Sequence, residues 1–148
     1  MATNIYKNFI DGAWVSSNSG ETFEQRNPAK LNRITGRFQR STIADTENAI
    51  ACAQAAYPGW KATPPVERAA ILRRALEAMV RRKDEIAAVI TEENGKTLPE
   101  AAGEVQAAIL EMDFQIGEGL RLYGQTVPSL QPGMHAYSVR EPLGVVSV

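Results

Sequence analysis

The sequence has little of the chemistry that disulfides, metal centres and nucleophilic triads require. Its 148 residues include a single cysteine, Cys52, and a single histidine, His135. One cysteine excludes an intramolecular disulfide and is typical of a reducing compartment, and one histidine is too few for a histidine-rich metal site. Cys52 lies in an alanine-rich stretch with no sequence neighbour that would activate its thiol, so we interpret its role as structural or incidental. We interpret His135 as a loop or strand residue with a local hydrogen bond.

Long apolar runs and an excess of one charge are also missing. The 16 basic and 17 acidic side chains give a net charge of −1, which argues against a nucleic-acid partner. The apolar stretches are short and interrupted by charge, so the sequence predicts neither a transmembrane helix nor a membrane partner. Residues 1–7 lack the apolar segment of a secretory signal. We therefore expect a cytoplasmic protein.

Two motif-like patterns do not amount to a binding site. Gly117 and Gly119 resemble the start of a dinucleotide-binding fingerprint, but the next glycine, Gly124, is misplaced and no strand precedes the pair. A row of glutamates recurs every seven residues: Glu104, Glu111 and Glu118. This spacing places them about 10 Å apart along a helix, too far for one metal ion. The residues alone predict no catalytic residue, no cofactor-binding residue and no metal ligand.

The first 40 residues have the pattern of short strands and tight turns. Asp11-Gly12 lies between apolar residues, which is a strong hairpin signal. Thr22–Gln25 is predicted as the next strand, Asn27-Pro28 as a turn, and Arg33–Arg40 as a further strand.

From residue 42 the pattern becomes helical. Thr42 and Asp45 form a variant capping box, and Pro58-Gly59 is expected to end this first helix. Three more helical segments are predicted: from Pro65, from 84 to 94 (continuing or restarting the previous one, and capped by Gly95), and from about Leu98 to Tyr123.

The last residues have the pattern of a strand entering a buried parallel sheet. A strand at 136–141 precedes Pro142, and a Pro-Leu-Gly step leads into the apolar run Val145–Val148. A buried parallel strand needs neighbours delivered by crossovers of a dozen or more residues, which this sequence does not supply. We favour the interpretation that the chain is the N-terminal portion of a longer protein. The alternative is a stand-alone, non-catalytic interaction module that binds a partner through the open strand.

Six segments of the sequence resemble, in order, the N-terminal portion of the NAD(P)-dependent aldehyde dehydrogenase superfamily. They are Asn8–Val15, Asn27–Ala29, Asp45–Trp60, Pro65–Arg68, Glu93–Val105 and Arg140–Val146. The resemblance covers the whole chain. It implies an α/β fold, the N-terminal part of the aldehyde dehydrogenase fold, incomplete as given. It places a hairpin and the helices of the cofactor-binding domain in residues 1–134, an oligomerisation-arm strand in 135–142, and the truncated first strand of a Rossmann-like sheet in 143–148.

The resemblance implies oxidation of an aldehyde to the carboxylic acid with NAD or NADP by a homo-oligomer, a dimer or tetramer. In the family, a cysteine attacks the aldehyde, hydride transfer gives a thioester, and a glutamate activates the water that releases the acid. An asparagine side chain and a backbone amide stabilise the oxyanion. These residues and the cofactor contacts correspond to positions beyond Val148, and Cys52 does not match the nucleophile's context. The 148 residues alone are therefore expected to be inactive.

In family members the long helix also lines part of the substrate entrance. Four of its residues here are candidates for shaping that tunnel: Phe114, Gly117, Glu118 and Arg121. For each, plain helix packing or a solvated charge is the alternative. The surrounding pattern is most similar to semialdehyde dehydrogenases of the α-ketoglutarate semialdehyde type, with departures at Gln131 and Ser147. A carboxylated substrate would need arginines in the tunnel, and Arg121 is the candidate that the pattern supplies.

Overall fold

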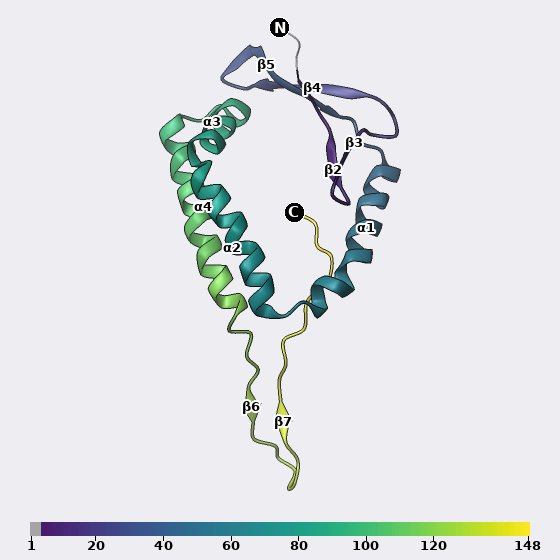
Figure 1. The fold of residues 1–148 in the computed structure, drawn as a ribbon, viewed down its shortest axis with the longest axis vertical. Coiled ribbons are helices and arrows are strands. Elements are labelled where there is room, and N and C mark those ends of the chain that lie inside the picture. Colours follow the sequence, from purple (N-terminus) through teal and green to yellow (C-terminus); the bar gives the residue numbers. More distant parts are fainter. Residues whose placement is uncertain (1–3) are drawn as a thin grey trace.

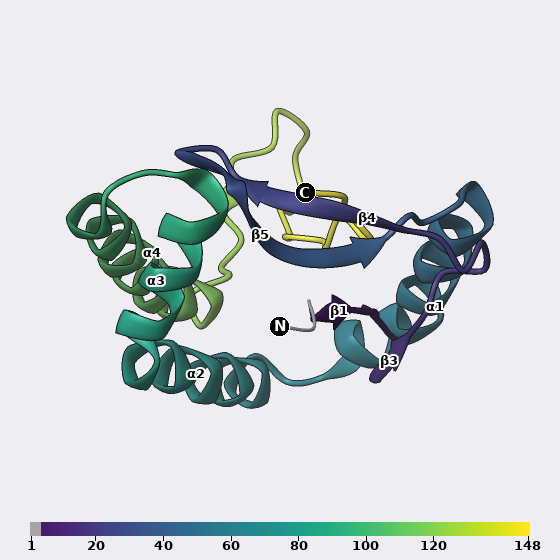
Figure 2. The same cartoon turned by 90° about the horizontal axis from the view of Figure 1, so that it is seen from above.

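The computed structural model describes residues 4–148, which form an open, curved arrangement of strands and helices (Figure 1). The strands are β1 (Ile5–Tyr6), β2 (Asn8–Ile10), β3 (Ala13–Val15), β4 (Thr22–Asn27), β5 (Lys30–Gln39), β6 (Thr126–Val127) and β7 (Ala136–Tyr137). The helices are α1 (Ile43–Ala62), α2 (Pro65–Arg81), α3 (Lys83–Asn94) and α4 (Leu98–Gly119). Seen from above, α1 and the α2–α4 group lie on opposite sides of the molecule (Figure 2). The arrangement confirms the predicted α/β class.

The predicted N-terminal hairpin is confirmed. β2 and β3 pair antiparallel around the turn Asp11-Gly12, whose φ angles are 50° and 76°. A two-residue hairpin turn needs positive φ at both central positions, which Asp-Gly supplies at low steric cost. Phe9 and Trp14 face each other across the pair, with ring centroids 5.0 Å apart. This contact stabilises the register of the hairpin.

The two further strands predicted in this region are also confirmed, and both are longer than expected. β4 and β1 pair with opposite edges of β5, β4 antiparallel and β1 parallel, giving the order β1-β5-β4. A glycine in β5 permits the approach of β1, because a Cβ on Gly36 would lie 2.5 Å from Cε2 of Tyr6. The Tyr6 ring stacks on Phe38 at 4.9 Å.

Helix α1 begins as predicted but ends later. The Thr42–Asp45 capping box is present. The prediction that Pro58-Gly59 ends the helix is wrong: Pro58 lies inside it, and the chain stays helical to Ala62. The helix ends only where Pro64 follows, because a residue before proline is disfavoured in the helical region. Thr63 accordingly is extended, with φ −63° and ψ 128°.

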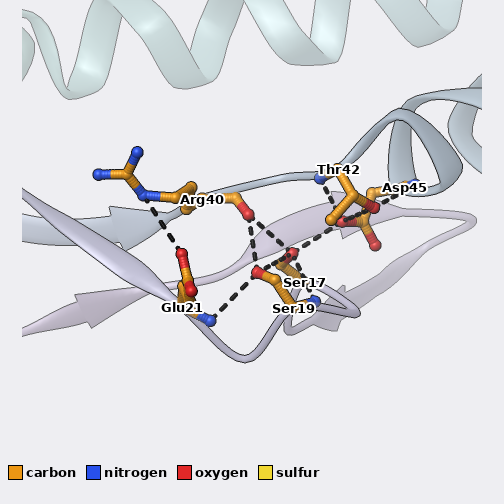
Figure 3. A network of polar contacts seen from close by, with 6 residues as sticks. All are labelled: Ser17, Ser19, Glu21, Arg40, Thr42 and Asp45. Atoms are coloured by element: carbon orange, nitrogen blue, oxygen red, sulfur yellow. Dashed lines mark hydrogen bonds and ion pairs between the residues drawn. The ribbon is translucent and has the colours of Figure 1, made fainter.

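Asp45 holds the start of α1 against the β3–β4 connection, because its carboxylate accepts hydrogen bonds from Thr42 and Ser17 (Figure 3). The backbone N–H of Asn18 donates to the same carboxylate. In the same network, Ser17 and Ser19 both donate to the backbone carbonyl of Arg40. These bonds fix the direction in which α1 leaves the sheet.

The remaining helices begin and end at identifiable signals. Arg82, with φ −104° and ψ 15°, separates α2 from α3, so the second helix restarts rather than continues. Gly95 caps α3 in the left-handed region with φ 81°, as predicted. The prediction that the long helix reaches Tyr123 is wrong, because α4 ends at Gly119. The N–H groups of Leu120 and Arg121 bond to carbonyls three residues earlier, at 3.2 and 2.9 Å, which tightens the chain out of the α-helix.

The hydrophobic core lies between α2, α3 and α4. Its buried members are Ala69, Leu76, Ala87, Ala101, Val105, Ile109 and Ile116. α1 lies apart from this bundle (Figures 1 and 2). The core therefore stabilises one side of the molecule only.

A two-stranded arm projects from the end of α4. β6 pairs antiparallel with β7, and the arm extends away from the rest of the chain (Figure 1). The predicted strand at 136–141 is reduced to Ala136–Tyr137. Residues 143–148 return between α1 and the bundle without forming a strand in the described part of the chain. A strand requires a paired neighbour, so the assignment of 143–148 to a Rossmann-like sheet stays a prediction.

The chain exposes far more surface than a closed fold of its size. Its accessible area is 11378 Å², against about 7,400 Å² for a compact monomer of 16.1 kDa. Large apolar side chains contribute to the excess, including Leu72, Val80 and Val89 of the bundle and Ile50 of α1. None of the helices in residues 4–148 combines the length and hydrophobicity needed to cross a bilayer.

Candidate functional site

The four residues predicted to shape a substrate tunnel lie around the C-terminal end of α4. Arg121 folds back onto the helix: its Nε donates to Oε1 of Glu118 at 3.2 Å, and its Nη2 makes a second, short contact with the same oxygen. The guanidinium lies over Gly117, where a Cβ would be 3.5 Å from Nη2. Phe114 lies one turn earlier and is 58% exposed. The structure thus brings Gly117, Glu118 and Arg121 together, with Phe114 at their edge.

Glu118 compensates much of the charge of Arg121. The hydrogen bond that Arg121 donates to Glu118, together with the negative charge of Glu118, raises the pKa of Arg121 above its ordinary value. Both side chains are about half exposed, so the pair adds little to stability. Its effect on recognition is larger, because a guanidinium already paired with a carboxylate attracts a second carboxylate less strongly. That these residues shape a tunnel stays a prediction.

Arg121 also lines a groove at the base of the β6–β7 arm. It consists of adjoining cavities of about 540, 190 and 600 Å³. The first two share Trp60, Arg68 and Leu122, and the first and third share Arg140. We call these cavities together the arm-base groove. Its walls come from the end of α1, the start of α2, the end of α4 and the two sides of the arm.

Two arginines of the arm-base groove are held by backbone carbonyls. Arg68 donates through Nη1 to the carbonyl of Thr63 at 2.5 Å, beyond the last turn of α1. Arg140 donates through Nε to the carbonyl of Tyr123 at 3.3 Å. Sequence reasoning missed both arginines as groove residues. Positions 68 and 140 carry no local signal, and only the fold brings them to one surface.

The segment after the arm is tied to α1 across this groove. Lys61 Nζ lies 3.2 Å from Oε2 of Glu141, and the Tyr57 hydroxyl donates to the carbonyl of Pro142 at 3.4 Å. The hydrogen bond to Glu141 raises the pKa of Lys61 above its ordinary value. Because Glu141 is paired with Lys61, the arginines leave the arm-base groove with a net positive charge.

The structure places Cys52 and His135 in separate parts of the fold, and the local hydrogen bond expected for His135 stays a prediction. Cys52 is partly buried in α1, with its Sγ 3.9 Å from Oδ1 of Asn48, and His135 is exposed just before β7. The three glutamates of the seven-residue row contact three different partners: Lys96, Gln115 and Arg121. Within residues 4–148, no group of three His, Cys, Asp or Glu side chains is placed to hold a metal ion.

Gly117 and Gly119 are not placed to form a cradle for a dinucleotide cofactor. A pyrophosphate binds at a helix N-terminus, where free N–H groups point at it. Gly117 and Gly119 instead lie at the C-terminal end of α4, where carbonyl groups give a partial negative charge. These glycines therefore do not fit NAD or NADP, and no cofactor contact is assigned to this part of the chain.

The model of the aldehyde dehydrogenase family matches residues 14–148. The chain belongs to the aldehyde dehydrogenase family. It is 42% identical to the alpha-ketoglutaric semialdehyde dehydrogenase of Bacillus subtilis (strain 168), over 98% of this chain and 30% of that protein. It is 33% identical to the succinate-semialdehyde dehydrogenase of Escherichia coli (strain K12) whose name specifies NADP(+), over 98% of this chain and 30% of that protein. The crystal structure of succinate-semialdehyde dehydrogenase from Burkholderia pseudomallei is 36% identical with a TM-score of 0.88, over 94% of this chain and 29% of that one.

This aldehyde dehydrogenase chain thus spans about 30% of the length of the curated relatives it matches. Its fold is that of the N-terminal part of these enzymes. The sequence resemblance is confirmed, including its similarity to semialdehyde dehydrogenases. The division into 1–134, 135–142 and 143–148 stays a prediction.

Proposed function

We propose that this chain is the N-terminal portion of an NAD(P)-dependent oxidoreductase that oxidises a semialdehyde, an aldehyde carrying a carboxylate, to the dicarboxylic acid. The observation that carries the proposal is the family match over residues 14–148. Relatives named for α-ketoglutaric and succinate semialdehydes support the substrate class. The alternative of a stand-alone interaction module has no support in the comparisons.

Within that enzyme, the described residues would bind and position rather than react. The side-chain contact that the structure gives for Cys52 is to the amide of Asn48, which is not a base, and Gly117 and Gly119 do not cradle a pyrophosphate. The arm-base groove, with Arg68 and Arg140, offers positive charge at the end of the helix predicted to line the substrate entrance. The isolated 148-residue chain is therefore expected to oxidise no aldehyde.

The arm supports a homo-oligomer, a dimer or a tetramer, as the assembled form. Its exposed side chains include Val127, Leu130, Tyr137 and Val139, each at least 45% exposed. A two-stranded ribbon has little stability alone, and its free edges can pair with another chain. Pairing of the arm with a second copy of the chain would bury these side chains.

The test is an assay of the protein purified from its native source, after its intact mass has been measured. Formation of NADH and NADPH would be followed with succinate semialdehyde and with α-ketoglutarate semialdehyde, and with butanal as a neutral aldehyde. We expect a mass well above 16.1 kDa and oxidation of at least one semialdehyde in preference to butanal. A mass matching 148 residues, or no reduction of either cofactor with any aldehyde, would refute the proposal.

A further inference from the structure

Arg140 differs from the other arginines of this region in which nitrogen atoms of its guanidinium have hydrogen-bond partners. Its Nε donates to the carbonyl of Tyr123, and neither Nη atom has an acceptor within the part of the chain that the structure describes. Arg121 is paired with Glu118, and Arg68 donates to carbonyls at the end of α1. Arg140 is therefore a positioned guanidinium with its two terminal nitrogens still available.

The walls around Arg140 suit a ligand with a short apolar stem and an anionic end. The residues that give the arm-base groove apolar surface beside Arg140 are Tyr57, Trp60, Leu122 and Pro142. The one acidic side chain of that cavity, Glu141, is paired with Lys61 at 3.2 Å. An entering carboxylate would meet positive charge rather than a competing acid. The two Nη atoms of a guanidinium match the two oxygens of a carboxylate.

We propose that Arg140 binds the carboxylate of the semialdehyde substrate in the arm-base groove. The inference rests on the proposed function, and it differs from the expectation drawn from the sequence, which singled out Arg121. Arg121 is compensated by Glu118, whereas Arg140 is anchored through a backbone carbonyl that has no charge to cancel its own. Trp60 and Leu122 contact the methylene stem of the substrate.

The decisive comparison uses the complete enzyme and three variants: Arg140→Gln, Arg140→Lys and, as a matched control, Arg74→Gln. Arg74 lies on the exposed surface of α2 and does not line the groove. For succinate semialdehyde, we expect Arg140→Gln to raise KM about tenfold with kcat unchanged, because a charged hydrogen-bond donor is lost. Arg140→Lys should recover part of that loss. KM for butanal should stay within about twofold in every variant.

A second readout separates this inference from the proposed function. Glutarate carries the carboxylate and cannot be oxidised as an aldehyde, so its binding by calorimetry needs no turnover. We expect glutarate to bind the complete wild-type protein and to lose about tenfold in affinity in Arg140→Gln. Inorganic phosphate should compete weakly; displacement of glutarate by phosphate at equal concentration would overturn the assignment to a carboxylate.

Equal rises of KM for succinate semialdehyde and butanal would assign Arg140 a structural role and refute the inference. Unchanged glutarate binding in an Arg140→Gln protein with wild-type circular dichroism and melting temperature would refute it as well. If wild-type protein oxidised no aldehyde but still bound glutarate through Arg140, the proposed function would fail and the anion site would stand.

Discussion

At the scale of single residues, Asp45 joins the start of α1 to the β3–β4 connection. Its carboxylate accepts hydrogen bonds from the backbone N–H of Thr42 and the hydroxyl of Ser17, both at 2.7 Å (Figure 3). It also accepts from the backbone N–H of Asn18 at 2.9 Å. Hydrogen bonds from the backbone N–H of Thr42, then the backbone N–H of Asn18 and the hydroxyl of Ser17, hold the pKa of Asp45 well below its ordinary value. Hydrogen bonds to the charged form account for this direction.

Replacement of Asp45 by Ala should lower the melting temperature by about 4 °C, because the α1 cap and the anchor of the β3–β4 connection are both lost. Glu47→Ala, on the exposed side of the same helix, is the control. Because the pKa is depressed in the folded state, the stabilisation is present above the pKa of an unfolded aspartate and is lost as the pH falls. The gap between wild type and Asp45→Ala should therefore shrink below about pH 5. A gap that stays constant to acid pH would show that the carboxylate's charge is not involved.

The sequence predicts only the local part of this hydrogen-bond network. Thr42 and Asp45 lie three residues apart, so their capping box is readable from local spacing. Ser17 lies 28 residues from Asp45, and no periodicity links them. The same limit hid Arg140 and Tyr123, which only the closure of the arm brings together.

At the scale of elements, local sequence signals predicted where most helices and strands begin. The wrong end predicted for α1 came from a region with two competing signals. Asp11-Gly12 and Gly95 were readable because each needs a positive φ that few residues tolerate. The prediction that Pro58 ends α1 was wrong because the helix tolerates this proline, and the helix ends before Pro64 instead. The capping box of Thr97 and Glu100 starts α4 and matches the usual pattern, although the prediction rested on the apolar periodicity instead.

The arm depends on one close approach of backbone. A Cβ on Gly124 would lie 1.8 Å from the carbonyl oxygen of Ser138, so Gly124→Ala must separate the two sides of the arm. We expect a loss of about 1–3 kcal/mol in the free energy of unfolding of the complete protein and a shift toward smaller species in sedimentation velocity. Gly103→Ala in α4 is the matched control, since nothing lies within 4 Å of its Cβ position. A Gly124→Ala protein with wild-type stability and assembly would contradict the closed arm.

At the scale of the whole molecule, the sequence predicts the core of the α2–α4 bundle, but it does not predict which apolar residues of these helices stay exposed. Val105, Ile109 and Ile116 recur at helical spacing and are buried, as the apolar seam predicts. The same reasoning could not tell which apolar residues stay exposed, because burial depends on what packs against them. Val80, Val89 and Leu110 are at least 50% exposed although they occupy helices.

The surface excess leads to a prediction about the 148-residue chain purified alone. With 11378 Å² exposed, about half as much again as a compact monomer of this mass, its uncovered apolar faces should bind a hydrophobic dye and self-associate. We expect strong dye fluorescence with helical circular dichroism and a broad thermal transition, while the complete protein in the same buffer binds little dye and unfolds cooperatively. Raising the chain concentration should increase the scattered light, since association buries the same faces. A monomeric chain that binds no dye and unfolds in one sharp transition would mean that these helices close on themselves in solution, and the longer protein would not be needed to cover them.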